Sequence, residues 1–475
     1  MKHYLCLTAT LAIAAVLCSC NNPSPEAVEP LEVSNTTALD RNHRVIYELN
    51  LYNFTQEGTL KAAKARLEEL RSLGVDIVWL MPIQPRSKRG KIGSLGSPYA
   101  LQDYTKVNPQ HGTLDDLKAY TEEAHRLGME VWMDWVPNHT GLDHVWVTEH
   151  KDYYQQKDGE IVHPNNYGDV YQLDYSNNEL RQAMTDAVIY WVENAGIDGF
   201  RFDYISSPAI PAEFWQEAIP AIRKAGKDKY IGMLAEGDLA DRKDLYSVGF
   251  DYDYAWGFHD NIAQKVGTTD KAKVLQNWCN SLVSNSNYDN MDRMVYLTNH
   301  DDGNDGKNYF SDFGNNVPPL TVMEFTLYGM PMLYNGQEIG YRPVQDYFNK
   351  SLINWSSPDK KLQNTIATLI ALRHTQPALS SGKKAERGTT TFLDTDQKTT
   401  VLCYKREKDD NQVVVAVNLS TDSATFTIQG VDEGNYAQWL NSATVQNGTT
   451  LTHRHLTANP TLTLEGKGYA VYVKE

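Results

Sequence analysis

Three acidic residues, each at the end of a short apolar run, are the part of this sequence best suited to chemistry. Asp203 and Glu236 each close such a run, and Asp301 follows a third. Two carboxyl groups of unlike pKa, one ionised and one protonated, are what cleavage of a glycosidic bond requires. In a retaining reaction these two groups lie roughly 5–5.5 Å apart. The acids therefore predict a carboxylate-based site for glycosidic bond cleavage.

The neighbours of these acids suggest a role for each. Arg201 lies two residues before Asp203, so both side chains point to the same side of the expected strand. The guanidinium is expected to hold Asp203 ionised, as a nucleophile must be. The apolar residues 233–235 are expected to raise the pKa of Glu236, so that it keeps its proton until the proton is used. Asp301 is then free to stabilise the positive charge of the transition state.

An isolated aspartate at a strand end is more often a helix cap than a catalyst. Three acids together, accompanied by Arg201 and two histidines, favour the catalytic interpretation. We expect Asp134, in contrast, to support the site by hydrogen bonds and to take no part in the reaction. Trp79 and Trp135 are expected to lie in the core.

Eight short apolar runs, separated by amphipathic helical patterns, must position these side chains. They cover residues 45–49, 77–80, 130–135, 199–203, 231–235, 250–254, 294–298 and 332–335. Eight strand–helix units predict an α/β fold, the (β/α)8 TIM barrel, whose catalytic groups lie at the carboxyl ends of the strands. Thr113 and Asp116 have the spacing of a capping box, and Gly74 is placed to end the first helix.

Two parts of the chain depart from a plain barrel. Residues 139–176 lack a strong period and are expected to form a short inserted subdomain after the third strand. From residue 383 the pattern becomes that of alternating strands, at 389–393, 400–405, 413–419, 424–428 and 469–473. We therefore expect a catalytic barrel over 41–382 and a C-terminal antiparallel β-sandwich over 383–475.

The first 40 residues are expected to target and tether the protein. An apolar stretch at 5–17 is too short to span a bilayer and leads into Leu17-Cys-Ser-Cys20. This arrangement resembles a bacterial lipoprotein signal over 1–19, with lipid attached to Cys20; a plain signal peptide is the alternative. The resemblance implies secretion across the inner membrane and a lipid anchor in the outer membrane. Residues 20–40, rich in Pro, Ser, Asn and Glu, are expected to form a disordered tether.

Charge and cysteine content limit the partners of the chain. The net charge of −16 provides no basic surface for nucleic acid and does not favour binding to anionic lipid. Of the five cysteines, Cys279 and Cys403 remain once the signal and the lipid site are set aside. These two fall in different predicted domains, so they are expected to be free, buried thiols.

The same segments resemble four conserved regions of the α-amylase family of glycoside hydrolases, over residues 45–379. The matching segments are Asp134-Trp-Val-Pro-Asn-His139, Gly199-Phe-Arg-Phe-Asp203, Leu234-Ala-Glu236 and Asn299-His-Asp301. The resemblance implies that Asp203 is the nucleophile, Glu236 the acid/base and Asp301 the transition-state stabiliser. It also implies four substrate-binding residues: Tyr99, His139, Arg201 and His300. The implied reaction is retaining hydrolysis of α-1,4-glucosidic bonds in starch-like glucans or maltodextrins.

Two departures from the family pattern concern the leaving side of the substrate and the structural calcium ion. Ser206 and Ser207 stand where family members often have a Lys-His pair. The family's calcium would use Asn138 and a backbone carbonyl that Ser207 can offer, but the expected aspartate position holds Gln172. Calcium favours carboxylate ligands. A calcium ion bound at this site would lack the carboxylate that Gln172 replaces. The chemistry itself requires no cofactor.

Two other functions are compatible with these residues. One is an α-glucan transglycosylase or a sugar isomerase on the same fold, in which a sugar hydroxyl replaces water as acceptor. The other is a non-catalytic lipoprotein that binds glycans at the cell surface. The intact set of three acids disfavours the second alternative.

Overall fold

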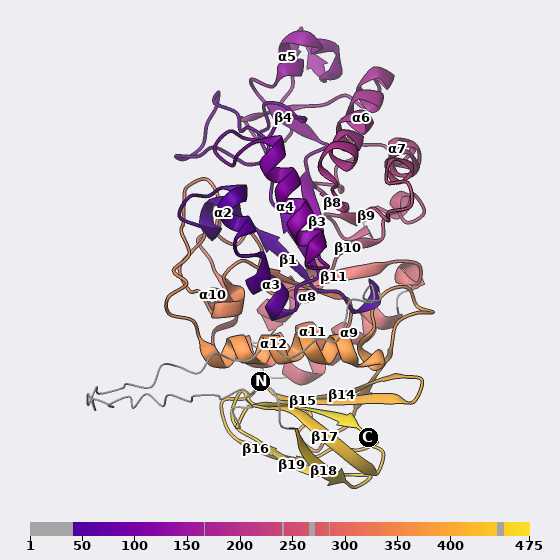
Figure 1. Cartoon of the computed structure of the whole chain (residues 1–475). Coiled ribbons are helices and arrows are strands. Elements are labelled where there is room, and N and C mark those ends of the chain that lie inside the picture. The colour runs from indigo at the N-terminus through magenta and orange to yellow at the C-terminus, as the bar shows by residue number, and fades with distance from the viewer. Residues whose placement is uncertain (1–40, 166, 240–241, 266–270, 285, 444–450) are drawn as a thin grey trace, which may run out of the picture.

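The computed structural model describes residues 41–165, 167–239, 242–265, 271–284, 286–443 and 451–475. Eight parallel strands close into a barrel in the order β1-β2-β3-β8-β9-β10-β11-β12 (Figure 1). They are β1 Ile46–Leu49, β2 Ile77–Leu80, β3 Glu130–Trp135, β8 Gly199–Phe202, β9 Gly232–Ala235, β10 Tyr252–Tyr254, β11 Asp292–Tyr296 and β12 Met330–Tyr334. The closed parallel sheet confirms the predicted (β/α)8 fold.

The expected and observed strands differ most at β11 and β12, which each begin two residues earlier than the apolar run. Asp292 and Arg293 open β11, and both are buried. Arg293 donates through Nε to the Asp253 carboxylate at 2.8 Å, so its charge is paired inside the barrel. A search for apolar runs misses such a strand end because a buried ion pair replaces hydrophobic residues there.

Helices surround the barrel and link its strands (Figure 1). They are α1 Leu51–Phe54, α2 Leu60–Lys64, α3 Leu67–Leu73, α4 Leu114–Arg126, α6 Asn178–Ala195, α7 Ala212–Ala225, α8 Trp256–Lys265, α9 Lys271–Ser284, α10 Tyr309–Phe313, α11 Val317–Thr326 and α12 Lys360–Thr375. Short 3-10 turns cover Arg41–His43, Lys151–Tyr153, Lys243–Leu245, Ser286–Tyr288, Gly314–Asn316, Gln337–Ile339 and Pro377–Leu379.

The helix boundaries follow local sequence. The Thr113 side chain accepts from the amide of Asp116 at 3.2 Å, and the Asp116 carboxylate accepts from the amide of Thr113 at 2.9 Å. This is the predicted capping box at the start of α4. Gly74 ends α3 with a φ of 104°, a conformation that glycine adopts readily. The single helix expected before Gly74 is instead divided into α2 and α3.

The inserted subdomain follows β3. It contains two small two-stranded sheets, β4 His139–Gly141 with β7 Val170–Gln172 and β5 Gln156–Lys157 with β6 Glu160–Ile161, together with α5 Val145–Glu149. In Figure 1 this subdomain lies at the end of the molecule opposite the C-terminal domain. Because β4 begins at His139, the insertion is joined directly to the carboxyl end of β3.

The C-terminal domain consists of two antiparallel sheets. Six strands have the order β13-β14-β15-β20-β17-β18, and β16 pairs with β19. Their bounds are β13 Thr389–Leu393, β14 Val401–Lys408, β15 Asn411–Asn418, β16 Ala424–Thr427, β17 Gly434–Asn441, β18 Thr452–Leu456, β19 Thr461–Leu464 and β20 Tyr469–Lys474. The two sheets enclose a core that includes Cys403, Val414, Phe426 and Leu462. The sequence did not predict β17, β18 and β19.

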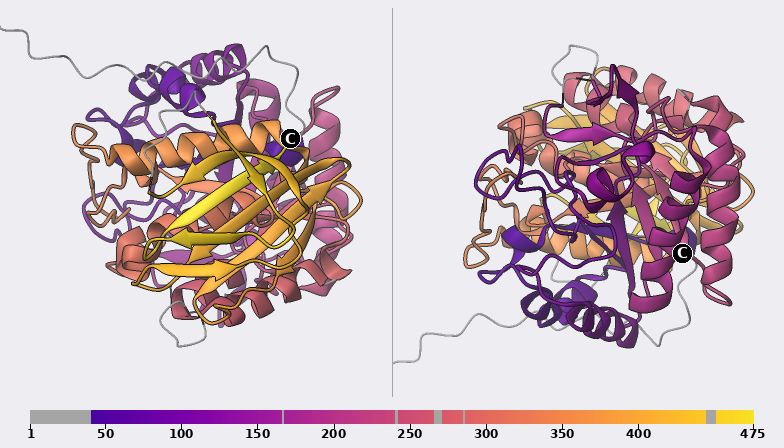
Figure 2. Two further views of the ribbon diagram at one scale, coloured as in Figure 1. Left: turned by 90° about the horizontal axis from the view of Figure 1, so that it is seen from below. Right: turned by 90° about the horizontal axis from the view of Figure 1, so that it is seen from above.

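The C-terminal domain covers one end of the barrel, and the insertion and loops cover the other, as the two views of Figure 2 show. Arg406 of β14 is fully buried at the first of these ends and donates to the carbonyls of Thr326 and Ser380. Cys279 and Cys403 are free and buried, as expected. The predicted signal, Cys20 and the tether lie outside the described residues. Within the described ranges, no helix is long and apolar enough to cross a membrane.

Candidate active site

Arg201 is the centre of the site, at the carboxyl end of β8. Its side chain is 0% exposed. The guanidinium donates through Nη1 to Asp134 Oδ1 at 2.9 Å and to Asp203 Oδ1 at 3.0 Å, and Nη2 forms an ion pair with Glu236 Oε1 at 2.5 Å. Its Nε donates to the hydroxyl of Tyr254 at 3.1 Å. One buried cation therefore pairs with three carboxylates from three neighbouring strands.

Asp203 and Glu236 face the same space, because they contact neighbouring nitrogens of one guanidinium. Their carboxyl groups consequently lie no farther apart than the roughly 9.5 Å that bounds the acid pairs of glycosidases. The side chains are 11% and 13% exposed, respectively. Both carboxyl groups are thus largely shielded from water but remain accessible to a bound substrate.

Burial sets the proton affinity of both acids. It raises the pKa of Asp203 to about 6, although the charge of Arg201 lowers it. Burial also raises the pKa of Glu236 to about 7, against the effect of Arg201 and with the help of the negative charges of Asp203 and Asp301. Glu236 is therefore the weaker acid of the two. The sequence predicts that the guanidinium dominates the pKa of Asp203, but burial outweighs it there.

Backbone geometry after the fourth strand of the barrel positions Glu236. Tyr204, directly after Asp203, has a φ of 52°, which is unusual for a residue with a bulky side chain. Its amide donates to Glu236 Oε2 at 2.5 Å. The backbone amide of Glu236 in turn donates to the carbonyl of Phe202 at 2.9 Å. The strained residue thus links the end of β8 to the acid at the end of β9.

Asp301 lies on the loop after β11 and is the most accessible of the three acids, with 53% of its side chain exposed. Asn299 accepts from the Asp301 amide at 3.0 Å through Oδ1. His300 Nε2 lies 3.3 Å from Asp301 Oδ1. The turn at the strand end therefore holds Asp301 beside the other two acids while leaving it open to solvent.

Glu48 belongs to the site but was not predicted from the sequence. It is fully buried near the end of β1 and pairs with His300 Nδ1. Burial lowers the pKa of His300, but the charges of Asp301 and Glu48 outweigh this effect and raise it to about 10. His300 is therefore an imidazolium at neutral pH. The available sequence signal was a lone acid inside the apolar run of the first strand, Ile46-Tyr-Glu-Leu49.

Tyr99 and His139 line the same region. The Tyr99 hydroxyl donates to Asp134 Oδ2 at 3.1 Å and lies 2.7 Å from His300 Nε2. His139 starts β4, and burial lowers its pKa to about 4, so its ring is neutral at pH 7. The structure thus brings together Tyr99, Arg201, His300 and the three acids through direct contacts. Tyr254, at the end of β10, is a further residue of the site that was not predicted from the sequence.

The Asn138 and Ser207 oxygens expected to bind calcium already accept hydrogen bonds. Gln172 Nε2 donates to the carbonyl of Asn138 at 2.8 Å and to its Oδ1 at 3.2 Å. The guanidinium of Arg242 donates through Nη1 to the carbonyl of Ser207 at 2.6 Å. Calcium requires six to eight oxygen ligands. Because N–H donors already bind these oxygens, the residues present do not fit a calcium ion.

Eight parallel strands with paired acids at their carboxyl ends define the class of (β/α)8 glycoside hydrolases. The chain matches the family model of the alpha-amylase catalytic domain over residues 34–172 and 165–377. These matches cover most of the chain, so the protein belongs to the alpha-amylase family.

Relatives and solved structures agree with this assignment. The chain is 26% identical to Alpha-amylase MalA of Haloarcula japonica over 82% of its length, and 25% identical to Alpha-amylase 2 of Dictyoglomus thermophilum over 78%. It spans 57% and 66% of those two proteins. An alpha-amylase structure from Lactobacillus plantarum is 26% identical with a TM-score of 0.75, covering 91% of this chain and 99% of that one.

Proposed function

We propose that the protein hydrolyses α-1,4-glucosidic bonds of starch-like glucans or maltodextrins, with retention at the anomeric carbon. The observation that carries this proposal is the pair of acids on one guanidinium, of which Glu236 has the higher pKa. A retaining reaction needs an ionised nucleophile beside a protonated acid. The names of several relatives, among them alpha-amylase and cyclomaltodextrinase, point to glucan substrates.

The proposed reaction has two steps. A carboxylate oxygen of Asp203 attacks the anomeric carbon, the bond from that carbon to the leaving sugar oxygen breaks, and Glu236 gives its proton to that oxygen. The product is a glycosyl ester on Asp203. The Glu236 carboxylate then takes a proton from water as the water oxygen attacks the anomeric carbon, and Asp203 leaves as a carboxylate. Asp301 faces the positive charge that develops on the sugar ring in both steps.

Product analysis tests this proposal against its alternatives. Purified protein is incubated with starch, pullulan, cyclodextrin and maltose, and products are followed by chromatography. Hydrolysis yields shorter maltooligosaccharides, which NMR should show as α-anomers at early times. Longer oligosaccharides or a rearranged disaccharide would instead identify a transglycosylase or an isomerase. Binding without turnover would identify a non-catalytic glycan-binding protein.

The activity is expected to depend on pH as a bell with its maximum between about pH 6 and pH 7. The ratio kcat/KM should rise as pH increases through about 6, because Asp203 must be ionised to attack. It should fall as pH increases above about 7, because Glu236 must retain its proton. The two acids interact, so the limbs report the titration of the pair. Initial rates from pH 4 to 9 measure it, and a maximum above pH 8 would contradict the assignment.

We infer that the protein needs no calcium for stability, since Gln172 and Arg242 take the place of the ion. Millimolar Ca²⁺ is expected to change the Tm of metal-stripped protein no more than Mg²⁺ at the same concentration. Gln172→Asp replaces the donor amide with a carboxylate beside Asn138. That variant should be less stable without the ion and should regain Tm with Ca²⁺. A large calcium-specific rise in the Tm of the unaltered protein would contradict the inference.

We also propose that the protein is secreted across the inner membrane and anchored to the outer membrane by lipid on Cys20. The support is the Leu17-Cys-Ser-Cys20 segment after a short apolar stretch. Expression with a radioactive fatty acid should label the protein, and Cys20→Ala should abolish the label. Cys279→Ala serves as the matched control. An unlabelled parent protein, cleaved after a plain signal peptide, would overturn the proposal.

A further inference from the structure

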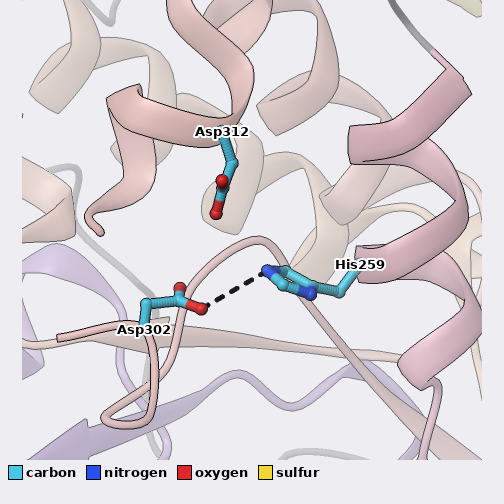
Figure 3. Close-up of side chains that lie close together, drawn as sticks. All are labelled: His259, Asp302 and Asp312. Atoms are coloured by element: carbon cyan, nitrogen blue, oxygen red, sulfur yellow. Dashed lines mark ion pairs between the residues drawn. The ribbon is translucent and has the colours of Figure 1, made fainter. Parts of the chain in front are cut away.

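Three side chains that take no part in the ion pairs of the catalytic acids point toward one another (Figure 3). His259 lies on α8, Asp302 on the loop after β11, and Asp312 on α10. Figure 3 shows the imidazole and both carboxylates pointing toward one another. One ligand atom from each residue lies within 4.8 Å of those of the other two. Three groups of the kinds that can bind a metal ion, from α8, α10 and the loop before α10, therefore share one small volume.

The imidazole of His259 is oriented as a metal-binding histidine would be. Its Nδ1 lies 2.8 Å from Asp260 Oδ1, so a proton on Nδ1 is donated to that carboxylate. When the ring is neutral with its proton on Nδ1, the other nitrogen, Nε2, carries the lone pair and faces the cluster. Nε2 is buried and has no hydrogen-bond partner among the described residues. Metal-binding histidines commonly donate their second ring nitrogen to a carboxylate in this way.

Packing fixes the plane of this ring. It stacks on Tyr296 with 5.2 Å between ring centroids and 12° between planes, and the edge of Phe313 contacts it on another side. Tilting the ring out of this plane would break both contacts.

The Asp302 carboxylate is also held in place. Its Oδ2 accepts from the Thr298 hydroxyl at 2.6 Å. Its Oδ1 lies 3.7 Å from His259 Nε2, beyond the range of a good hydrogen bond. Two ligands of one tetrahedral ion, with bonds of roughly 2.0–2.2 Å, are about 3.5 Å apart. The observed 3.7 Å between Nε2 and Oδ1 is closer to the distance between two ligands of one metal ion than to the length of a hydrogen bond.

We propose that His259, Asp302 and Asp312 bind a divalent first-row metal ion of the zinc class, with water completing its coordination. One imidazole and two carboxylates suit Zn²⁺ or Mn²⁺, whereas Ca²⁺ prefers oxygen ligands alone. The ion connects α8 and α10 to the loop after β11, which carries Asp301 on the residue before Asp302. The site is thus a brace for the loop of the accessible catalytic acid, and it does not depend on the proposed reaction.

Metal titration of the purified, chelator-treated protein tests this site. With ZnCl2, elemental analysis after gel filtration should give one equivalent per chain, and Tm should rise with the concentration of the ion. Asp312→Asn should weaken binding at least ten-fold. Asp260→Ala keeps all three ligands but removes the partner of Nδ1, and should weaken binding about ten- to a hundred-fold. Asp305→Asn, which removes a charge from the same loop, is the control and should bind as the parent does.

Diffraction from crystals grown with Zn²⁺ gives a readout that does not depend on any variant. An anomalous peak at the zinc edge is expected between His259 Nε2 and the two carboxylates. No stoichiometric binding, a peak elsewhere, or equal affinity in the parent and Asp312→Asn would overturn the proposal. In that case the three side chains form an ion-pair cluster around a protonated His259.

Discussion

Asp203→Asn is expected to lower kcat on maltodextrins by about 10⁴-fold or more, the largest effect of any single change in this chain. An amide is a poor nucleophile, so the glycosyl ester cannot form. The shape of the side chain is kept, and the remaining oxygen can still accept from Arg201 Nη1, which it does at 3.0 Å in the parent. Asp134 continues to pair with the buried guanidinium, and Glu236 still contacts it. The variant should therefore fold.

The measurement compares initial rates with glucan affinity. Calorimetric titration of the variant with maltoheptaose should show saturable binding, because Asp203 acts on the anomeric carbon and does little of the binding. Asp115→Asn is a suitable control, since Asp115 is almost fully exposed on α4. A kcat within ten-fold of the parent would show that Asp203 is not the nucleophile. Parent and variant that both bind without turnover would establish the glycan-binding alternative.

Much of the site could be predicted because of where its residues lie in the strands. Asp203 and Glu236 follow β8 and β9 directly, and Asp301 lies on the loop just after β11. A parallel barrel gathers the carboxyl ends of all its strands at one rim. Local sequence therefore predicts which side chains meet there, even though they lie far apart along the chain.

Glu48 could not be predicted in the same way, because its role depends on a partner 252 residues away. Its position in β1 is level with Trp79 in β2 and Tyr334 in β12. The turn after β11 then brings the His300 ring to it. A lone acid inside a strand signals only that some buried partner exists, and the register of the closed barrel decides which one.

The edge strand β18 illustrates a second limit. Its sequence Thr-His-Arg-His-Leu has four exposed residues followed by buried Leu456, so no alternation of apolar and polar residues marks it. It forms because β17 offers backbone groups for pairing.

The raised pKa of Asp203 also depends on the tertiary structure. The surrounding barrel removes water from a carboxylate that local sequence places beside a cation.

Glu236→Gln is expected to lower kcat on maltodextrins by about 10²- to 10⁴-fold, because the leaving sugar then departs without a proton. The size of the loss should depend on the leaving group. An aryl α-maltoside with an acidic phenol leaves as a stable anion, so its first step should be nearly as fast as in the parent. Stopped-flow absorbance should then show a burst of phenol, since the second step still lacks a base to activate water.

Azide separates the two roles of Glu236. As an anion it attacks the glycosyl ester without losing a proton, so it should restore steady turnover of the aryl substrate and yield an α-glycosyl azide. Asp203→Asn should show neither the burst nor the rescue, because it forms no ester. If Glu236→Gln lost the same factor on both substrates and azide had no effect, Glu236 would be a positioning residue. Its contacts with Arg201 and with the Tyr204 amide would then be its main contribution.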